Sequence, residues 1–200
     1  MIDTVIFDVG RVLVDWDPRH LYRKLLPDEA AIDHFLTEIC PPEWNLEQDL
    51  GRTWAEGVAI QSAKFPDHAP MIAAWNQRWH ETMPDALWDT VALFERLEAR
   101  GVALYGLTNF SQEKWPDTVA RFPFLSRFRD VVVSGEVGMV KPDPRIFELL
   151  LSRNGLDPAQ CLFIDDSEKN VEGARAVGLT THHFTEADRL ATALADLNLT

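Results

Sequence analysis

Five short runs of apolar residues, each bounded by polar or turn residues, recur along the chain and predict buried strands. These runs cover residues 4–8, 102–107, 130–133, 161–165 and 179–184. Segments with apolar side chains every three or four positions predict helices over 87–100, 112–121, 144–153, 167–177 and 186–197. Glycine follows several of these segments, which is typical of helix ends. The alternation predicts an α/β fold with a doubly wound, Rossmann-like core, in which helices cover both faces of a mostly parallel sheet.

One long segment breaks this alternation, because nothing in it has the pattern of a strand. Its apolar residues fall at helical spacing, as in Met71, Trp75 and Trp79, which follow one another every four residues. Prolines divide the segment into short helices. We therefore expect a helical insert directly after the first strand. The expected division is residues 1–16 and 85–200 for the core and residues 17–84 for the insert.

The composition of the chain argues against some classes of binding partner. The chain of 200 residues has 32 acidic and 19 basic residues, and its formal net charge of −13 argues against binding to nucleic acids or anionic membranes. Its two cysteines, Cys40 and Cys161, form no Cys-x-x-Cys pattern, and a bridge between them is not expected. No stretch approaches the roughly 18 apolar residues of a membrane span, and no signal segment opens the sequence. We expect a cytoplasmic protein that is a monomer or a homodimer.

Carboxylates stand at the ends of two of the predicted strands. Asp8 closes the first run and is followed by Val9 and Gly10, while Asp165 and Asp166 close the fourth. Open α/β sheets place their chemistry at the carboxyl ends of their strands. Three carboxylates there favour an oxygen-lined cation site, with one carboxylate available to attack a substrate.

Four sequence elements together resemble the motifs of one enzyme family. They are Asp8 in Val-Ile-Phe-Asp-Val-Gly, Thr108 in Gly-Leu-Thr-Asn, Lys141 in Gly-Met-Val-Lys-Pro-Asp-Pro, and the pair Asp165-Asp166. In this order they resemble the nucleophile, phosphate-holding, lysine and acidic motifs of the haloacid dehalogenase (HAD) superfamily, in its phosphatase-like branch of subfamily IA type. The resemblance spans nearly the whole chain, and it implies that the helical insert is a cap domain.

The resemblance implies a Mg²⁺-dependent phosphatase. Its substrate would be a small phosphomonoester, with sugar phosphates as one candidate class, and hydrolysis would pass through an aspartyl-phosphate formed on Asp8. Thr108 would bind a phosphoryl oxygen, Lys141 would neutralise charge, and Asn109 would contact the substrate. The expected metal ligands are Asp8, the backbone carbonyl of Gly10, and the pair Asp165 and Asp166, of which either could be the direct ligand.

One departure from the family pattern concerns the general acid. Most phosphatases of the family have a second Asp two residues after the nucleophile, where this chain has Gly10. Three alternatives follow: a phosphatase that works without this acid, a metal-independent 2-haloacid dehalogenase, or an inactive protein that binds a metabolite or another protein. Dehalogenases of the family use no metal, and an unneutralised acidic pair would repel their carboxylate substrates. The joint presence of the motif residues argues against an inactive protein, so we favour the phosphatase.

Several other residues allow two interpretations. Asp15 and Asp17 could replace the missing acid, although a turn and a helix N-cap explain them better. Asn170 could belong to the site or to the surface. The tryptophans of the insert could line a specificity pocket, although packing explains most of them. Arg11 could bind an anionic substrate group, although a solvated surface position is the simpler interpretation.

Overall fold

Five parallel strands form a single sheet in the order β3-β2-β1-β4-β5. The computed structural model describes residues 1–199. The strands are β1 (Thr4–Phe7), β2 (Ala103–Thr108), β3 (Val131–Val133), β4 (Cys161–Asp165) and β5 (Thr180–His183). Each of them lies within one residue of its predicted bounds. The topology confirms the predicted Rossmann-like α/β fold.

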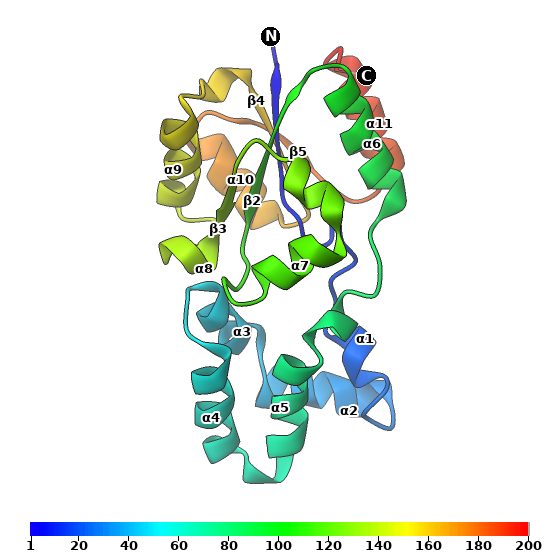
Figure 1. Cartoon of the computed structure of the whole chain (residues 1–200), viewed down its shortest axis with the longest axis vertical. Coiled ribbons are helices and arrows are strands. Elements are labelled where there is room, and N and C mark those ends of the chain that lie inside the picture. Colours follow the sequence, from blue (N-terminus) through cyan, green and yellow to red (C-terminus); the bar gives the residue numbers. More distant parts are fainter. Residues whose placement is uncertain (200) are drawn as a thin grey trace.

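Helices cover both faces of the sheet (Figure 1). The core helices are α6 (Trp88–Ala99), α7 (Trp115–Arg121), α8 (Ser134–Val137), α9 (Pro144–Asn154), α10 (Glu168–Ala176) and α11 (Ala187–Asp196), with short 3₁₀ turns η4 (Pro123–Arg127) and η5 (Pro158–Gln160). Val5 and Phe7 pack in the same cluster as α6 and α11, whereas Ile6 packs in a second cluster with α9 and α10. Both faces of β1 are therefore buried, which explains why its sequence is continuously apolar. The helix predicted from residue 112 begins at Trp115, and the sequence did not predict α8.

The segment between β1 and α6 is helical, and no strand forms in its residues 17–84. It contains α1 (Arg19–Tyr22), α2 (Glu29–His34), the π-helical turn η1 (Phe35–Ile39), α3 (Pro42–Asp49), α4 (Trp54–Lys64), η2 (Pro66–His68), α5 (Ala69–Gln77) and η3 (Trp79–Thr82). Thr53 and Glu56 form a capping box at the start of α4. The expected helical repeat through Trp79 stops early, because Arg78 leaves helical geometry and ends α5 (φ −119°, ψ 28°). The division into a core and a cap stays a prediction.

The helical segment packs beneath the carboxyl ends of the strands (Figure 1). Trp44, Trp54, Trp79 and Phe110 form a chain of aromatic contacts with ring centroids 5.1–5.7 Å apart. Trp54 Nε1 also donates a hydrogen bond to Ser111 Oγ at 3.1 Å. These residues belong to the same buried cluster as β1, so the core is continuous from the sheet into the helical segment.

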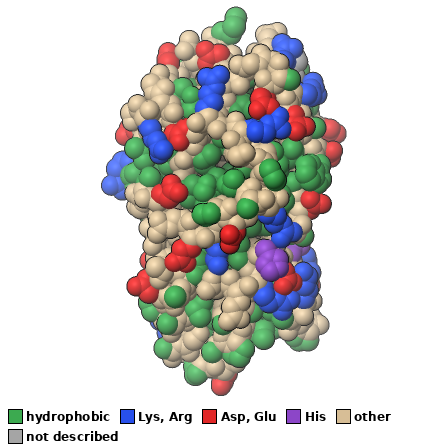
Figure 2. All heavy atoms as spheres, viewed as in Figure 1, with side chains coloured by type: hydrophobic (Ala, Val, Ile, Leu, Met, Phe, Trp, Pro, Cys, Tyr) green, Lys and Arg blue, Asp and Glu red, His purple; other side chains and the backbone are tan. Residues whose placement is uncertain are grey.

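The cysteines, the helix lengths and the surface charge bear on three further expectations from the sequence. Cys40 and Cys161 are both buried and form no disulfide with each other. Within residues 1–199, no helix combines the length and the apolar character that crossing a bilayer requires. On the face shown in Figure 2, basic side chains lie among acidic ones instead of forming one broad basic field.

Candidate active site

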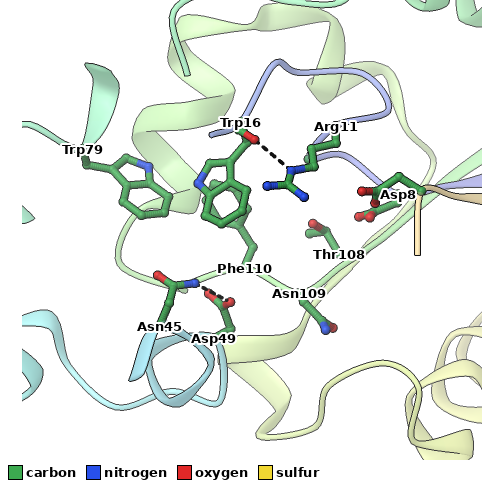
Figure 3. Close-up of a pocket in the computed structure, with 11 residues that line it drawn as sticks. Asp8, Arg11, Trp16, Asn45, Asp49, Trp79, Thr108, Asn109 and Phe110 are labelled. Atoms are coloured by element: carbon green, nitrogen blue, oxygen red, sulfur yellow. Dashed lines mark hydrogen bonds between the residues drawn. The ribbon is translucent and has the colours of Figure 1, made fainter. Parts of the chain in front are cut away.

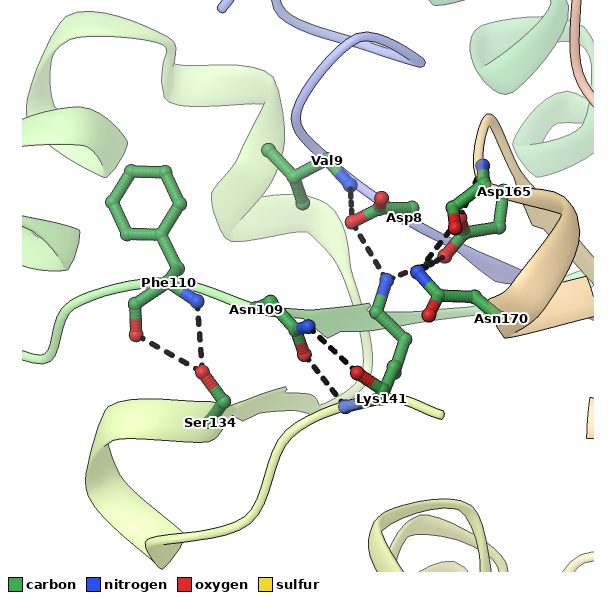
Figure 4. Close-up of polar contacts among 9 residues, drawn as sticks. Asp8, Val9, Asn109, Phe110, Ser134, Lys141, Asp165 and Asn170 are labelled. Carbon is green, nitrogen blue, oxygen red and sulfur yellow. Dashed lines mark hydrogen bonds and ion pairs between the residues drawn. The ribbon is translucent and has the colours of Figure 1, made fainter. Parts of the chain in front are cut away.

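The sheet brings the predicted carboxylates together. β1 and β4 are neighbours in register, with Phe7 opposite Ile164, so Asp8 and the Asp165-Asp166 pair leave the same edge of the sheet. Asp8, Asp165 and Asp166 each offer an oxygen, and these oxygens all lie within 4.8 Å of one another. Figure 4 shows Asp8 and Asp165 pointing toward the same lysine side chain.

That lysine is Lys141, whose side chain is fully buried. Its Nζ lies 3.0 Å from Asp8 Oδ1 and donates to Asp165 Oδ2 at 2.6 Å. Burial alone would lower the pKa of Lys141, but the charges of Asp165 and Asp8 outweigh it and raise that pKa. Lys141 thus contacts two of the three carboxylates, and the positive charge of Arg11 acts on the third, Asp166. Three carboxylates still outnumber these two cations, and the remaining negative charge fits a hard divalent cation such as Mg²⁺.

The three carboxylates differ in how many hydrogen bonds their oxygens already accept. Both oxygens of Asp165 accept hydrogen bonds, from the backbone N–H of Ser167 at 2.8 Å, from Asn170 Nδ2 at 3.0 and 3.1 Å, and from Lys141. Asp166 is only partly buried and lines the adjoining cavity. Burial, and then the charge of Asp165, raises the pKa of Asp166.

The hydrogen bond and the ion pair of the Asp8 carboxylate involve the same oxygen, Oδ1. Its Oδ1 accepts a hydrogen bond from the backbone N–H of Val9 at 2.7 Å and lies next to Lys141 Nζ. Burial raises the pKa of Asp8, Lys141 lowers it, and Asp165 and Asp166 raise it further. A cation between these carboxylates would favour their ionised forms.

The end of β2 supplies Thr108 and Asn109. Thr108 is buried and lines the cavity beside Asp8. Asn109 lines it as well, but both ends of its amide pair with the backbone of Lys141: Nδ2 donates to Lys141 O at 3.0 Å, and Oδ1 accepts from Lys141 N at 2.8 Å. Asn109 therefore fixes the loop that delivers Lys141, and its expected contact with the substrate stays a prediction.

A cavity of about 200 Å³ opens in front of Asp8 (Figure 3). Its lining combines strand-end residues with Trp16 and with three residues of the helical segment, Asn45, Asp49 and Trp79. The sequence offers Trp79 as a candidate for the lining but does not indicate Asn45 and Asp49, which lie four residues apart on α3. Asn45 Nδ2 donates to Asp49 Oδ2 at 3.0 Å. A polar i, i+4 pair of this kind on a short helix gives no sequence signal that separates it from a solvated helix face.

The other residues that the sequence left open fall into two groups. Asn170 and Arg11 lie at the candidate site: Asn170 is buried and donates to Asp165, and Arg11 lines the cavity with a left-handed backbone (φ 60°). Among the described residues that line this first cavity, Asp15 and Asp17 do not occur. Asp15 lies 3.0 Å from His20 Nε2, and Asp17 Oδ1 accepts from the backbone N–H of Arg19 at the start of α1, which supports the turn and helix-start interpretation.

The chain belongs to the haloacid dehalogenase-like hydrolase family, whose model matches residues 2–178. Its sequence is 27% identical to sesquiterpene phosphatase astK of Aspergillus oryzae, over 94% of this chain and 92% of that protein. It is 29% identical to the glyceraldehyde 3-phosphate phosphatase of Methanopyrus kandleri, over 90% of this chain and 83% of that protein. The protein is therefore a hydrolase with phosphatases among its relatives.

Solved structures of the family share the architecture. The HAD family enzyme bt-2542 from Bacteroides thetaiotaomicron, in complex with magnesium and inorganic phosphate, has a TM-score of 0.70 at 27% identity, over 92% of this chain and 95% of that chain. The L-2-haloacid dehalogenase from Xanthobacter autotrophicus, with chloropropionic acid covalently bound, has a TM-score of 0.64 at 18% identity, over 100% and 85% of the two chains. The second likeness concerns the fold alone.

Proposed function

We propose that this protein is a Mg²⁺-dependent phosphatase that hydrolyses a small phosphomonoester through an aspartyl-phosphate on Asp8. The main support is the cluster of Asp8, Asp165 and Asp166 around one cavity, with Lys141 as the ammonium group that contacts two of them. The magnesium and phosphate complex of the Bacteroides enzyme is consistent with this chemistry.

Two carboxylate ligands of the metal follow from how many hydrogen bonds each carboxylate already accepts. Asp8 and Asp166 line the cavity, while Asp165 is saturated by Lys141, Ser167 and Asn170. We assign Asp8, Asp166 and the carbonyl of Gly10 as direct ligands, and Asp165 as the group that orients Lys141 and completes the negative field. Bound Mg²⁺ would supply charge neutralisation at the phosphoryl oxygens.

The reaction would begin at Asp8 Oδ2, because both donors to Asp8 act on Oδ1. Asp8 Oδ2 forms a bond to phosphorus, and the bond between phosphorus and the leaving-group oxygen breaks. Lys141 and the Thr108 hydroxyl hold charge that develops on the phosphoryl oxygens. Water then attacks phosphorus, the bond to Asp8 breaks, and inorganic phosphate leaves.

Room for the leaving group lies beside the first cavity. A second cavity of about 370 Å³ shares Arg11, Trp16 and Asn45 with it and is also lined by Leu36 and Trp75. A phosphomonoester whose organic part exceeds the phosphate group in size therefore has space in the second cavity, which adjoins the one that Asp8 lines. This arrangement supports a small organic phosphate as the substrate class.

The test is hydrolysis of p-nitrophenyl phosphate and of a panel of sugar, nucleotide and alkyl phosphates, with Mg²⁺ and with excess chelator. We expect turnover that disappears in chelator and returns with Mg²⁺. Release of chloride from 2-chloropropionate in chelator, without turnover of any phosphomonoester, would establish the dehalogenase alternative instead. Absence of both activities would leave the binding-protein alternative.

Two expectations from the sequence stay predictions. A cytoplasmic location is in keeping with two buried free thiols. The oligomeric state, monomer or homodimer, can be measured by light scattering of the purified chain.

A further inference from the structure

The cavity contains a carboxylic acid that takes no part in the proposed transfer of the phosphoryl group to Asp8 and water. A poor leaving group such as an alkoxide needs a proton as its bond to phosphorus breaks, and Gly10 cannot supply one. The carboxyl groups that line the cavity within residues 1–199 are those of Asp8, Asp49 and Asp166. Asp8 is the nucleophile and Asp166 a metal ligand in the proposed function, so Asp49 alone has no assigned task.

We propose that Asp49, from the helical segment, protonates the leaving-group oxygen and then takes a proton from the water that hydrolyses the aspartyl-phosphate. This inference rests on the proposed phosphatase function and assigns a further catalytic residue to it. In the first step the Asp49 O–H bond breaks, its proton joins the leaving-group oxygen, and Asp49 becomes a carboxylate. In the second step that carboxylate accepts a proton from water, which restores the acid and balances the cycle.

The core holds Asp49 in place although the residue lies far from it in sequence. Ser134 Oγ, at the start of α8, donates to Asp49 O at 2.5 Å and accepts from Phe110 N at 2.8 Å, next to the loop of Thr108 and Asn109. Two glycines permit this close approach. A Cβ on Gly51 would lie 2.9 Å from Gly135 O, and a Cβ on Gly135 would lie 2.6 Å from Gln112 N.

The environment of Asp49 favours a neutral acid that can ionise during turnover. Burial raises its pKa to about 7, close to the value that serves a general acid at neutral pH. Among the described residues its one side-chain partner is Asn45, whose Nδ2 donates to Asp49 Oδ2, so Asp49 Oδ1 stays available for a substrate. The charged groups that share the cavity are Asp8, Asp166 and Arg11, and nearby Arg52 donates to Gln48 Oε1 and Trp44 O instead of to Asp49.

The substitution Asp49→Asn keeps the shape of the side chain and removes its acid. The informative quantity is kcat/KM, which reports phosphoryl transfer to Asp8, for two probes with Mg²⁺: glycerol phosphate and p-nitrophenyl phosphate. We expect kcat/KM for glycerol phosphate to fall about 10²-fold or more, and that for p-nitrophenyl phosphate, whose leaving group needs no proton, by less than about 5-fold. A burst of one p-nitrophenolate per enzyme should precede slow turnover, because the base for hydrolysis of the intermediate is missing.

Two further variants sharpen the test. Asp67→Asn, at an exposed carboxyl of the helical segment outside the lining of both cavities, should leave both kcat/KM values unchanged. Gly10→Asp in the Asp49→Asn background should restore part of the glycerol phosphate activity, since a Cβ at Gly10 would have Trp16 Cβ as its nearest neighbour, at 3.7 Å. Rescue from this second position would identify the lost function as proton transfer rather than support of the fold.

Three results would overturn the inference while leaving the phosphatase function intact. These are equal losses for both probes in Asp49→Asn, unchanged activity on glycerol phosphate, or a wild-type enzyme that hydrolyses only the aryl ester. If Asp49→Asn fails to fold, the test uses the wild-type enzyme. The quantity measured is then kcat/KM for glycerol phosphate divided by kcat/KM for p-nitrophenyl phosphate. The inference requires this ratio to fall as pH rises above about 7, and a ratio independent of pH would contradict it. Lack of activity on both probes in wild type would refute the proposed function itself.

Discussion

The two sides of the cavity differ in how completely their buried polar atoms are paired. The strand side is formed by Asp8, Thr108, Asn109 and Asp166, with Lys141 and Asp165 behind them. Here Lys141 contacts two carboxylates, and both oxygens of Asp165 accept hydrogen bonds. On the helix side, formed by Trp16, Asn45, Asp49 and Trp79, several polar atoms have no partner within residues 1–199. These atoms are Trp16 Nε1, Asn45 Oδ1 and Trp79 Nε1.

The difference separates two tasks. The strand side is organised before any substrate arrives, as stabilisation of charge on a phosphoryl group requires. Each unpaired buried group on the helix side costs about 1–3 kcal/mol, so this side gains most from a ligand that brings hydrogen-bonding atoms. We therefore expect the strand side to determine the reaction and the helix side to determine which leaving group is accepted and how it is protonated.

The largest effect should follow removal of the nucleophile. Asp8→Asn cannot form the aspartyl-phosphate, so we expect a loss of kcat on the order of 10³-fold or more on p-nitrophenyl phosphate. Stability should not fall, because the substitution removes one of three crowded carboxylates. Steady-state kinetics and thermal denaturation check the two parts. Near wild-type turnover by Asp8→Asn would remove the basis for treating the strand side as the reactive one.

The next effect concerns the buried ammonium group on the strand side. Lys141→Met leaves Asp8 and Asp165 without their shared partner, so the free energy of unfolding in chelator should fall by about 3–5 kcal/mol. Urea titrations can measure this change, and added Mg²⁺ should recover part of it. Lys64→Met, at the exposed end of α4, is the matched control and should change stability little. Equal stability of Lys141→Met and wild type would mean that the strand side is not held together as described.

The sequence predicts the residues of the strand side better than those of the helix side, for a physical reason. Asp8 and Asp165 end neighbouring parallel strands, and parallel strands end at one edge, so the linear pattern alone brings these residues together. Lys141 required the resemblance to a family as well. The position of Asp49 depends on how α3 packs against α8, through a hydrogen bond to Ser134 that spans 85 residues of sequence. No local pattern encodes that contact.

Asp49 itself offers a test of the helix side that does not depend on activity. Its folded pKa of about 7 exceeds the ordinary 3.8, so between those pH values the folded state binds a proton that the unfolded state releases. The stability that Asp49 contributes is therefore present at low pH and is lost as pH rises through 7. At about 1.4 kcal/mol per pKa unit, Asp49→Asn should gain up to about 4 kcal/mol over wild type between pH 4 and pH 8.

Urea titrations of both proteins across that range, without Mg²⁺, measure the gain. The control is Asp67→Asn, an exposed carboxyl in the helical segment, for which the difference from wild type should stay the same at both pH values. A constant difference for Asp49→Asn as well would show that Asp49 is ionised in the folded protein, and the contrast between the two sides would weaken.

The smallest effect should come from Asn170, which acts on the strand side only through Asp165. Its Nδ2 donates to both Asp165 oxygens, at 3.0 and 3.1 Å, while Ser167 N and Lys141 Nζ hold the same carboxylate independently. Removing one of three donors should loosen Asp165 without releasing it. We therefore expect Asn170→Ala to lower kcat about 10-fold and to raise the Mg²⁺ concentration needed for half-maximal activity, as loss of a group behind metal ligands does.

The matched control for Asn170→Ala is Asn154→Ala. Asn154 Nδ2 also donates to a carboxylate, Asp130 Oδ2 at 2.9 Å, but at the end of α9 and outside the lining of the cavity. This control should lower stability slightly and leave the Mg²⁺ dependence unchanged. Equal kinetic effects of the two substitutions would mean that Asn170 supports the fold in general. A Mg²⁺ requirement shifted by Asn170→Ala alone would show that the saturation of Asp165, and not only its charge, organises the strand side.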